Sequence, residues 1–198
     1  MIHGLSSPVP VSRAASGTVS LPRRRVLAHA GAAAMAVPLL ALPRRARAEQ
    51  DERSLSLWHT HTGERLTMAF AVGGSLLRPA LARLDRFLRD HYSGAVGHID
   101  PGLYEQLFAL QTRLGSRAAF EVISGFRSPR TNDRLRQRGG GGVARASLHM
   151  QGRAIDVRLP DVALADLRDA ALELRAGGVG YYARERFVHL DTGRVRSW

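Results

Sequence analysis

Residues 147–159 read Ser147-Leu148-His149-Met150-Gln151-Gly152-Arg153-Ala154-Ile155-Asp156-Val157-Arg158-Leu159. The second half of this segment predicts a strand, because Ile155, Val157 and Leu159 alternate with their neighbours and fall on one face. Gly152 lies between His149 and Asp156 and provides a turn, so both side chains can point toward one place. An imidazole nitrogen and a carboxylate oxygen are both common metal ligands. The segment therefore predicts a strand together with part of a metal site.

A second segment, Phe187-Val188-His189-Leu190-Asp191-Thr192-Gly193, supplies the remaining ligand. His189 and Asp191 are two residues apart on a predicted strand, so they share a face. The two segments together offer His149, Asp156 and His189 as ligands, with Asp191 near the open position. Three protein ligands and one water form the arrangement of catalytic zinc sites. Spacing alone leaves open the alternative that these are solvated or hydrogen-bonded side chains without a metal.

Hydrophobic periodicity predicts an α+β domain. Asp100 and Pro101 mark a helix start with a capping side chain, and Gly115 marks the end of that helix. Alternating and helical patterns divide the rest of the domain into strands at 54–57, 64–70, 120–124, 154–159, 179–182 and 187–191, and helices at 79–91, 101–114, 131–137 and 163–174. Helices come mainly first and strands mainly later, which favours α+β. Gly139 to Gly142 is expected to be a flexible loop, either a lip of the cleft or a linker.

The first 48 residues predict a twin-arginine-like export signal. Arginines at 23–25 precede an apolar run from Val26 to Leu42, and Ala46-Arg47-Ala48 is a small-x-small cleavage pattern. An uncleaved N-terminal anchor is the alternative, although this Ala-rich run with an internal proline would be a weak membrane span. Either interpretation exports residues 49–198, a single domain, to the periplasm or beyond.

The net charge of +12 raises the question of a nucleic-acid partner. The distribution of the charged residues along the chain argues against one. All 29 basic residues are arginines; seven lie in residues 1–48, which hold no acidic residue, so +5 remains for residues 49–198. That remainder suits an anionic polymer such as cell wall, or a membrane surface. No interleaving of aromatic and basic residues predicts base stacking, so we expect no nucleic acid. The chain has no cysteine, so a metal must be held by histidines and carboxylates.

The motif Ser147-x-His149-x-x-Gly152-x-Ala154-x-Asp156 resembles the first signature of the zinc D-Ala-D-Ala carboxypeptidase and murein endopeptidase family. The preceding segment 124–128, Ser-Gly-Phe-Arg-Ser, is similar to the Ser-Gly-Tyr-Arg-Ser segment of that family. Segments 61–64, 177–182 and 187–198 are similar to its exported murein endopeptidase K subfamily, so the resemblance covers residues 54–198. It implies a small antiparallel sheet with flanking helices, and a Zn²⁺ ion at one end of the sheet bound by His149, Asp156 and His189.

The resemblance also implies catalytic residues. Arg127 matches the arginine that faces the substrate near the metal, where a guanidinium could hold a carboxylate or stabilise an oxyanion; the alternative is a surface arginine. Many relatives carry the general base a few residues before the last ligand, but Arg186, three before His189, cannot accept a proton. Asp191 and Glu185 are the candidates that remain. Asp191 is favoured as the base, and it could equally fix the orientation of His189.

The function implied by the resemblance is that of a murein endopeptidase, which hydrolyses peptide crosslinks of peptidoglycan with a metal-activated water. We expect a monomer that acts on stem peptides, with no integral membrane domain in residues 49–198. A D,D-carboxypeptidase or dipeptidase on the same fold, or a non-catalytic zinc-containing wall-binding module, stays open, as does the choice between D,D and L,D bonds. The other histidines considered are interpreted as structural or surface residues: His59, His61, His91 and His98.

Overall fold

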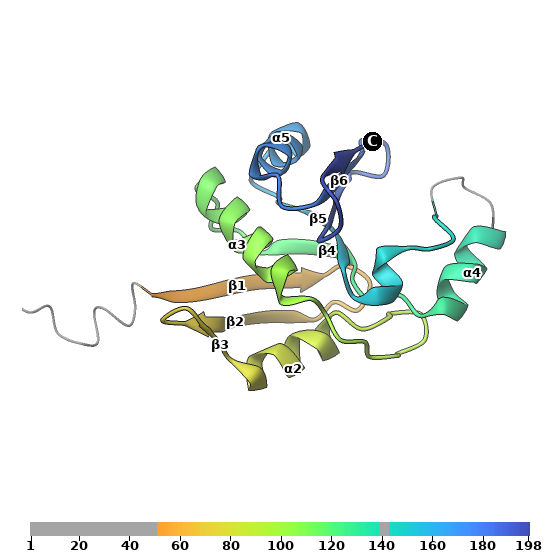
Figure 1. The fold of residues 1–198 in the computed structure, drawn as a ribbon, viewed down its shortest axis with the longest axis horizontal. Helices are drawn as coiled ribbons and strands as arrows, with labels where there is room; N and C mark the ends of the chain where they lie inside the picture. The colour runs from red at the N-terminus through yellow and green to blue at the C-terminus, as the bar shows by residue number, and fades with distance from the viewer. Residues whose placement is uncertain (1–50, 139–142) are drawn as a thin grey trace, which may run out of the picture. The chain divides into compact units, whose positions relative to one another are not determined.

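The computed structural model describes residues 51–138 and 143–198. The predicted export signal and the predicted glycine loop at 139–142 lie outside these residues. Within them, eight strands form one sheet in the order β3-β2-β1-β4-β5-β7-β6-β8 (Figure 1). The strands are β1 (Glu52–His59), β2 (Arg65–Val72), β3 (Ser75–Leu76), β4 (Phe120–Ser124), β5 (Ala154–Arg158), β6 (Gly178–Tyr182), β7 (Phe187–Asp191) and β8 (Arg196–Ser197).

The sheet is larger than the small antiparallel sheet expected from the sequence, and it is mixed. Most neighbouring strands are antiparallel, but β1 pairs with β4 and β6 pairs with β8 in parallel. The β1–β4 pairing joins strands that are separated in the chain by the segment containing β2 and α3, a crossover that local sequence patterns do not reveal. The strands β3 and β8 were missed because two residues are too few to display an alternating pattern.

The helices of the described residues follow the predicted pattern with shifted ends. They are α2 (Arg78–Phe87), α3 (Pro101–Leu114), α4 (Pro129–Gln137), α5 (Leu164–Leu174) and the short 3-10 helix η1 (Leu148–Gln151). α3 begins as expected, because the Asp100 side chain accepts a hydrogen bond from the Gly102 nitrogen at 2.9 Å. α2 ends before the predicted His91, because the Asp90 carboxylate accepts hydrogen bonds from the backbone nitrogens of Tyr92 and Ser93 and holds the chain in a turn.

Helices α3 and α5 pack against each other, with α3 on β1 and α5 on β6 and β7 (Figure 1). The side chains of Ile155, Val157, Val188 and Leu190 join the helices in one buried hydrophobic cluster. Because successive residues of a strand point to opposite faces, Asp156 and His189 project from the face of β5 and β7 that these helices do not cover. The core thus directs polar side chains of two central strands to the opposite side of the sheet. None of the helices that the structure describes is long and apolar enough to span a membrane.

Candidate metal centre

Three predicted ligands meet on the uncovered face of the sheet. In the antiparallel pairing of β5 and β7, Asp156 lies directly opposite His189. His149 comes from η1, and Gly152 reverses the chain after it with a φ of +65°. A Cβ at Gly152 would lie 1.8 Å from the His98 carbonyl oxygen, so only glycine fits this turn. All three ligands are buried, and one ligand atom of each lies within 4.8 Å of the others.

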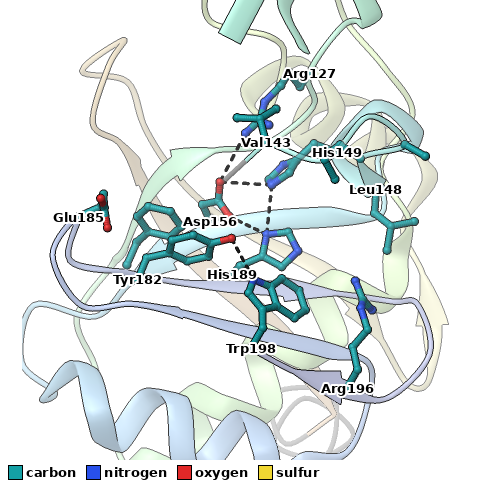
Figure 2. A pocket seen from close by; sticks show the side chains of 14 residues that line it. Arg127, Val143, Leu148, His149, Asp156, Tyr182, Glu185, His189, Arg196 and Trp198 are labelled. Carbon is teal, nitrogen blue, oxygen red and sulfur yellow. Dashed lines mark hydrogen bonds and ion pairs between the residues drawn. The ribbon is translucent and has the colours of Figure 1, made fainter. Parts of the chain in front are cut away.

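The orientation of each ring leaves one nitrogen facing the centre of the group (Figure 2). His149 donates from Nδ1 to the Gly125 carbonyl oxygen at 2.7 Å, so its Nε2 faces Asp156 Oδ2 at 3.2 Å. His189 presents Nδ1 to Asp156 Oδ1 at 2.8 Å and to His149 Nε2 at 3.3 Å. Two nitrogens and a carboxylate therefore converge, with no other protein ligand closing the set among the described residues. This donor set can hold a metal ion and leave a coordination position open.

The charges of the group are strongly coupled. Burial raises the pKa of Asp156, but interactions with His149 and His189 outweigh burial and hold that pKa well below its usual range. Burial lowers the pKa of His189, but hydrogen bonds to Asp156 and Asp191 outweigh burial and raise it to about 9. The raised pKa favours the protonated form of His189 at neutral pH when no metal is bound. Because a ligand nitrogen must be deprotonated, a metal ion bound by this group would displace this proton.

Arg127 lies beside the three ligands, in the loop that follows β4. Its backbone nitrogen donates to the His149 carbonyl oxygen at 3.2 Å, which ties the loop to η1. The guanidinium Nη2 donates to Ser124 Oγ at 3.3 Å and lies 3.7 Å from Asp156 Oδ2. The side chain is 13% exposed and lines the pocket above the ligands. A cation is therefore placed next to the open side of the centre.

The two carboxylates considered as general bases lie in different surroundings. Asp191 is fully buried and does not line the pocket; its Oδ2 lies 3.4 Å from His189 Nε2, the ring nitrogen that faces away from the group. Burial raises the pKa of Asp191, but hydrogen bonds, led by that from His189, lower it well below the usual range. Glu185, in the turn between β6 and β7, lines the pocket and pairs with Arg184 at 2.8 Å. Of these two carboxylates, only Glu185 lines the pocket in which a substrate would lie.

The centre lies in a pocket of about 360 Å³ that has an aromatic wall (Figure 2). Tyr182 and Phe187 stack with ring centroids 4.5 Å apart, and Trp198 donates from Nε1 to the Tyr182 hydroxyl at 2.9 Å. These wall residues and Arg196, which also lines the pocket, lie in segments that carry the family resemblance, but the sequence analysis gave them no role in the site. Strand periodicity could have identified Phe187, because it shares a face with His189. No local pattern places Trp198 at the pocket, because its position depends on the short strand β8.

Three of the four histidines set aside in the sequence lie together. His59 is fully buried, and the rings of His61 and His91 stack with centroids 4.2 Å apart. His61 and His91 line a smaller pocket of about 170 Å³ that reaches Arg127 and Asp156. This placement beside the metal centre was missed because it arises from contacts between distant segments. His98 is exposed and bonds to Asp85 at 3.0 Å, as expected of a surface residue.

Comparison with known proteins finds a family model and relatives that match most of this chain. Residues 47–198 match the family described as Peptidoglycan L,D-endopeptidase MepK. The protein of that name from Escherichia coli K12 is 44% identical over 176 residues, which are 88% of this chain and 96% of the relative. The probable peptidoglycan L,D-endopeptidase MepK of Haemophilus influenzae is 42% identical over 147 residues, 74% of this chain and 78% of the relative. No solved structure matches the chain at a comparable level. By the extent of these matches, the chain belongs to the peptidoglycan L,D-endopeptidase MepK family.

Proposed function

We propose that residues 49–198 form an exported, monomeric zinc peptidase that hydrolyses L,D peptide crosslinks of bacterial peptidoglycan. The observation that carries this proposal is the convergence of His149, Asp156 and His189 at the floor of a pocket in a member of this family. The names of the relatives favour L,D bonds over D,D bonds, the choice that the sequence motifs leave open. The net charge of +5 on residues 49–198 suits an anionic wall polymer.

Zinc is the metal that suits this donor set. Two imidazole nitrogens and one carboxylate, all supplied by protein, are the ligands of several catalytic zinc sites. His149 Nε2, His189 Nδ1 and a carboxylate oxygen of Asp156 would hold the ion. A zinc ion in such a site supplies Lewis acidity and lowers the pKa of a bound water to about 7. The remaining chemistry falls to side chains around the pocket.

The two carboxylates have different roles in this proposal: Glu185 is the general base, and Asp191 positions the ring of His189. Glu185 lines the pocket and accepts the proton of the attacking water. Asp191 lies on the far side of His189, pairs with Nε2 at 3.4 Å and so fixes the ring with Nδ1 toward the ligand group. This assignment reverses the preference drawn from strand periodicity, which favoured Asp191 as the base.

Arg127 stabilises the negative charge that develops on the scissile carbonyl oxygen. Its guanidinium lies 3.7 Å from Asp156 and has one hydrogen bond to a neighbouring side chain in the described residues, so N–H groups remain for the substrate. A positively charged donor held in place before the reaction needs no reorganisation as the oxyanion forms. The aromatic wall formed by Tyr182, Phe187 and Trp198 gives the stem peptide a surface to lie on.

The proposal is tested by digesting purified muropeptide dimers with zinc-loaded protein, with and without a chelator. One substrate carries an L,D crosslink and the other a D,D crosslink. We expect chelator-sensitive conversion of the L,D dimer to monomers, with the D,D dimer left intact. Intact dimers of both kinds, together with stoichiometric zinc, would support a wall-binding module instead. Removal of a terminal D-amino acid from uncrosslinked stems alone would support a carboxypeptidase.

A further inference from the structure

Asp191, the carboxylate next to His189 Nε2, is itself held by Arg196 of strand β8. We propose that Arg196 and Trp198 are positioning residues for the metal centre: Arg196 fixes Asp191, and Trp198 confines the ring of His189. We refer to Arg196, Trp198 and Asp191 as the β8 clamp. The proposal rests on the proposed function in one respect, namely that His189 is a metal ligand.

Arg196 holds Asp191 through two parallel hydrogen bonds. Its Nη2 donates to Asp191 Oδ2 at 2.6 Å, and its Nη1 donates to Oδ1 at 3.1 Å. The backbone nitrogens of Gly178 and Gly193 donate to the same Oδ1 at 3.0 and 2.7 Å. A bidentate guanidinium fixes both the position and the plane of a carboxylate. The plane of Asp191 in turn directs Oδ2 to His189 Nε2 at 3.4 Å.

Trp198 packs against the ring of His189 and limits its movement. The indole and the His189 imidazole have centroids 5.3 Å apart at an interplanar angle of 52° (Figure 2). The indole is held in place by its hydrogen bond to the Tyr182 hydroxyl at 2.9 Å and by the Arg196 guanidinium, 4.8 Å from its centroid. Backbone hydrogen bonds from Trp198 to Val179 and from Tyr181 to Trp198 fix its main chain. The same arginine thus contacts both parts of the clamp.

Two glycines of β6 provide the space that the clamp occupies. A Cβ at Gly178 would lie 2.3 Å from Arg196 Nη1 and 2.4 Å from Asp191 Oδ2. A Cβ at Gly180 would lie 2.7 Å from the indole of Trp198. Neither glycine has a positive φ, so the backbone does not require glycine at these positions. The room needed by Arg196 and Trp198 therefore accounts for both glycines of the Gly178-Val179-Gly180 segment.

A role in substrate binding is the alternative for Arg196, because its side chain also lines the pocket. The two roles predict different measurements. A residue that acts through Asp191 changes the affinity for zinc and the value of kcat, because it alters the orientation of a metal ligand. A residue that only binds substrate changes KM and leaves the affinity for zinc unaltered.

The test compares Arg196→Met, Arg196→Lys and the control Arg194→Met in the full chain. Arg194 is exposed, and no hydrogen bond or ion pair joins its side chain to Asp191 in the described residues. Zinc affinity is measured by competition with a chromophoric chelator, and kcat and KM are measured with zinc in excess. We expect Arg196→Met to weaken zinc binding by about 10–100-fold and to lower kcat without raising KM. Arg196→Lys recovers part of both losses, and Arg194→Met matches the wild type.

Two results would overturn the proposal: a folded Arg196→Met variant with wild-type zinc affinity and kcat, or a rise in KM alone. If Arg196→Met does not fold, Gly178→Ala gives the second test, because it keeps the ion pair but crowds both partners. Gly178→Ala is expected to weaken zinc binding and lower kcat, and wild-type values would equally contradict the clamp. The zinc measurements stand even if the wild-type protein cleaves no crosslink, so failure of the clamp and failure of the proposed function are distinguishable.

Discussion

His189 stands directly opposite Asp156 in the pairing of β7 with β5, and its Nδ1 lies 2.8 Å from Asp156 Oδ1. Cross-strand pairing, rather than a loop, therefore sets the separation of two of the three candidate ligands. Strands in the middle of a sheet hold such pairs rigidly, because the strand is hydrogen-bonded to a neighbour on each side.

Replacement of Asp156 by asparagine is expected to remove zinc and activity. The amide keeps the size of the side chain but lacks the charge that offsets a divalent cation and two imidazoles. Zinc content after gel filtration, measured by atomic emission, is the readout, with circular dichroism as a check of the fold. Asp166→Asn, at an exposed carboxylate on α5, is the control and should retain one zinc per chain. Stoichiometric zinc in the Asp156→Asn variant would rule out this ligand.

Substitution of Arg127 by methionine is expected to lower kcat by about 10²–10³-fold, the usual effect of removing one oxyanion donor. Zinc content should not change, because the Arg127 side chain contacts the ligand group only through a 3.7 Å approach to Asp156, and the backbone bond to His149 is kept in the variant. Steady-state kinetics on the crosslinked dimer provide the measurement, and Arg130→Met, on the exposed side of α4, provides the control. A rise in KM with unchanged kcat would instead assign Arg127 to a substrate carboxylate.

The assignment of Glu185 as proton acceptor predicts a pH effect. Its hydrogen bond with Arg184 lowers the pKa of Glu185 below the ordinary value, and the carboxylate must be ionised to accept a proton. Arg184→Met should therefore let this pKa rise and shift the acid limb of the kcat profile to higher pH. Glu185→Gln should lower kcat by about 10²–10⁴-fold while zinc remains bound. Full activity of Glu185→Gln would eliminate this residue as the base.

Metal-free protein is expected to lose stability as the pH rises from about 6.5 to about 9. The pKa of His189 is raised in the folded state from 6.5 to about 9, so its protonated form stabilises the fold below 6.5. That contribution disappears as pH rises through the folded-state pKa. Urea unfolding of chelator-treated protein at several pH values measures the effect. A His189→Gln variant should lack this pH dependence, and an equally steep decline in that variant would assign the effect to other groups.

The strands that carry the site could be predicted because their patterns are local. Ile155 and Val157 alternate with Asp156, and Val188 and Leu190 alternate with His189, so the sequence itself shows which residues face away from the core. The turn at Gly152 also has a local signature, because a left-handed residue between two candidate ligands favours glycine. These features explain why the amino-acid sequence alone points to the three candidate ligands.

Other parts of the site depend on contacts that no local pattern contains. Strand periodicity placed Asp191 on the same face as His189, but it does not indicate which ring nitrogen Asp191 approaches. The turn that brings Glu185 to the pocket contains Arg186 at a φ of +61°, a conformation that sequence does not predict for arginine. Arg196 and Trp198 reach the centre through β8, whose two residues pair with β6 although β7 lies between these strands in the chain.

Zinc-dependent hydrolysis is tested most directly by the activity of metal-free protein as zinc is added in measured equivalents. The wild type should gain hydrolysis of the L,D-crosslinked dimer in proportion to zinc and reach a plateau at one equivalent, since one group of three ligands is present in the described residues. His149→Ala, which removes the ligand on η1, should stay folded, bind no zinc at these concentrations and show no hydrolysis. Full hydrolysis by metal-free wild type, or by zinc-free His149→Ala, would show that a zinc ion held by His149 is not needed for the reaction.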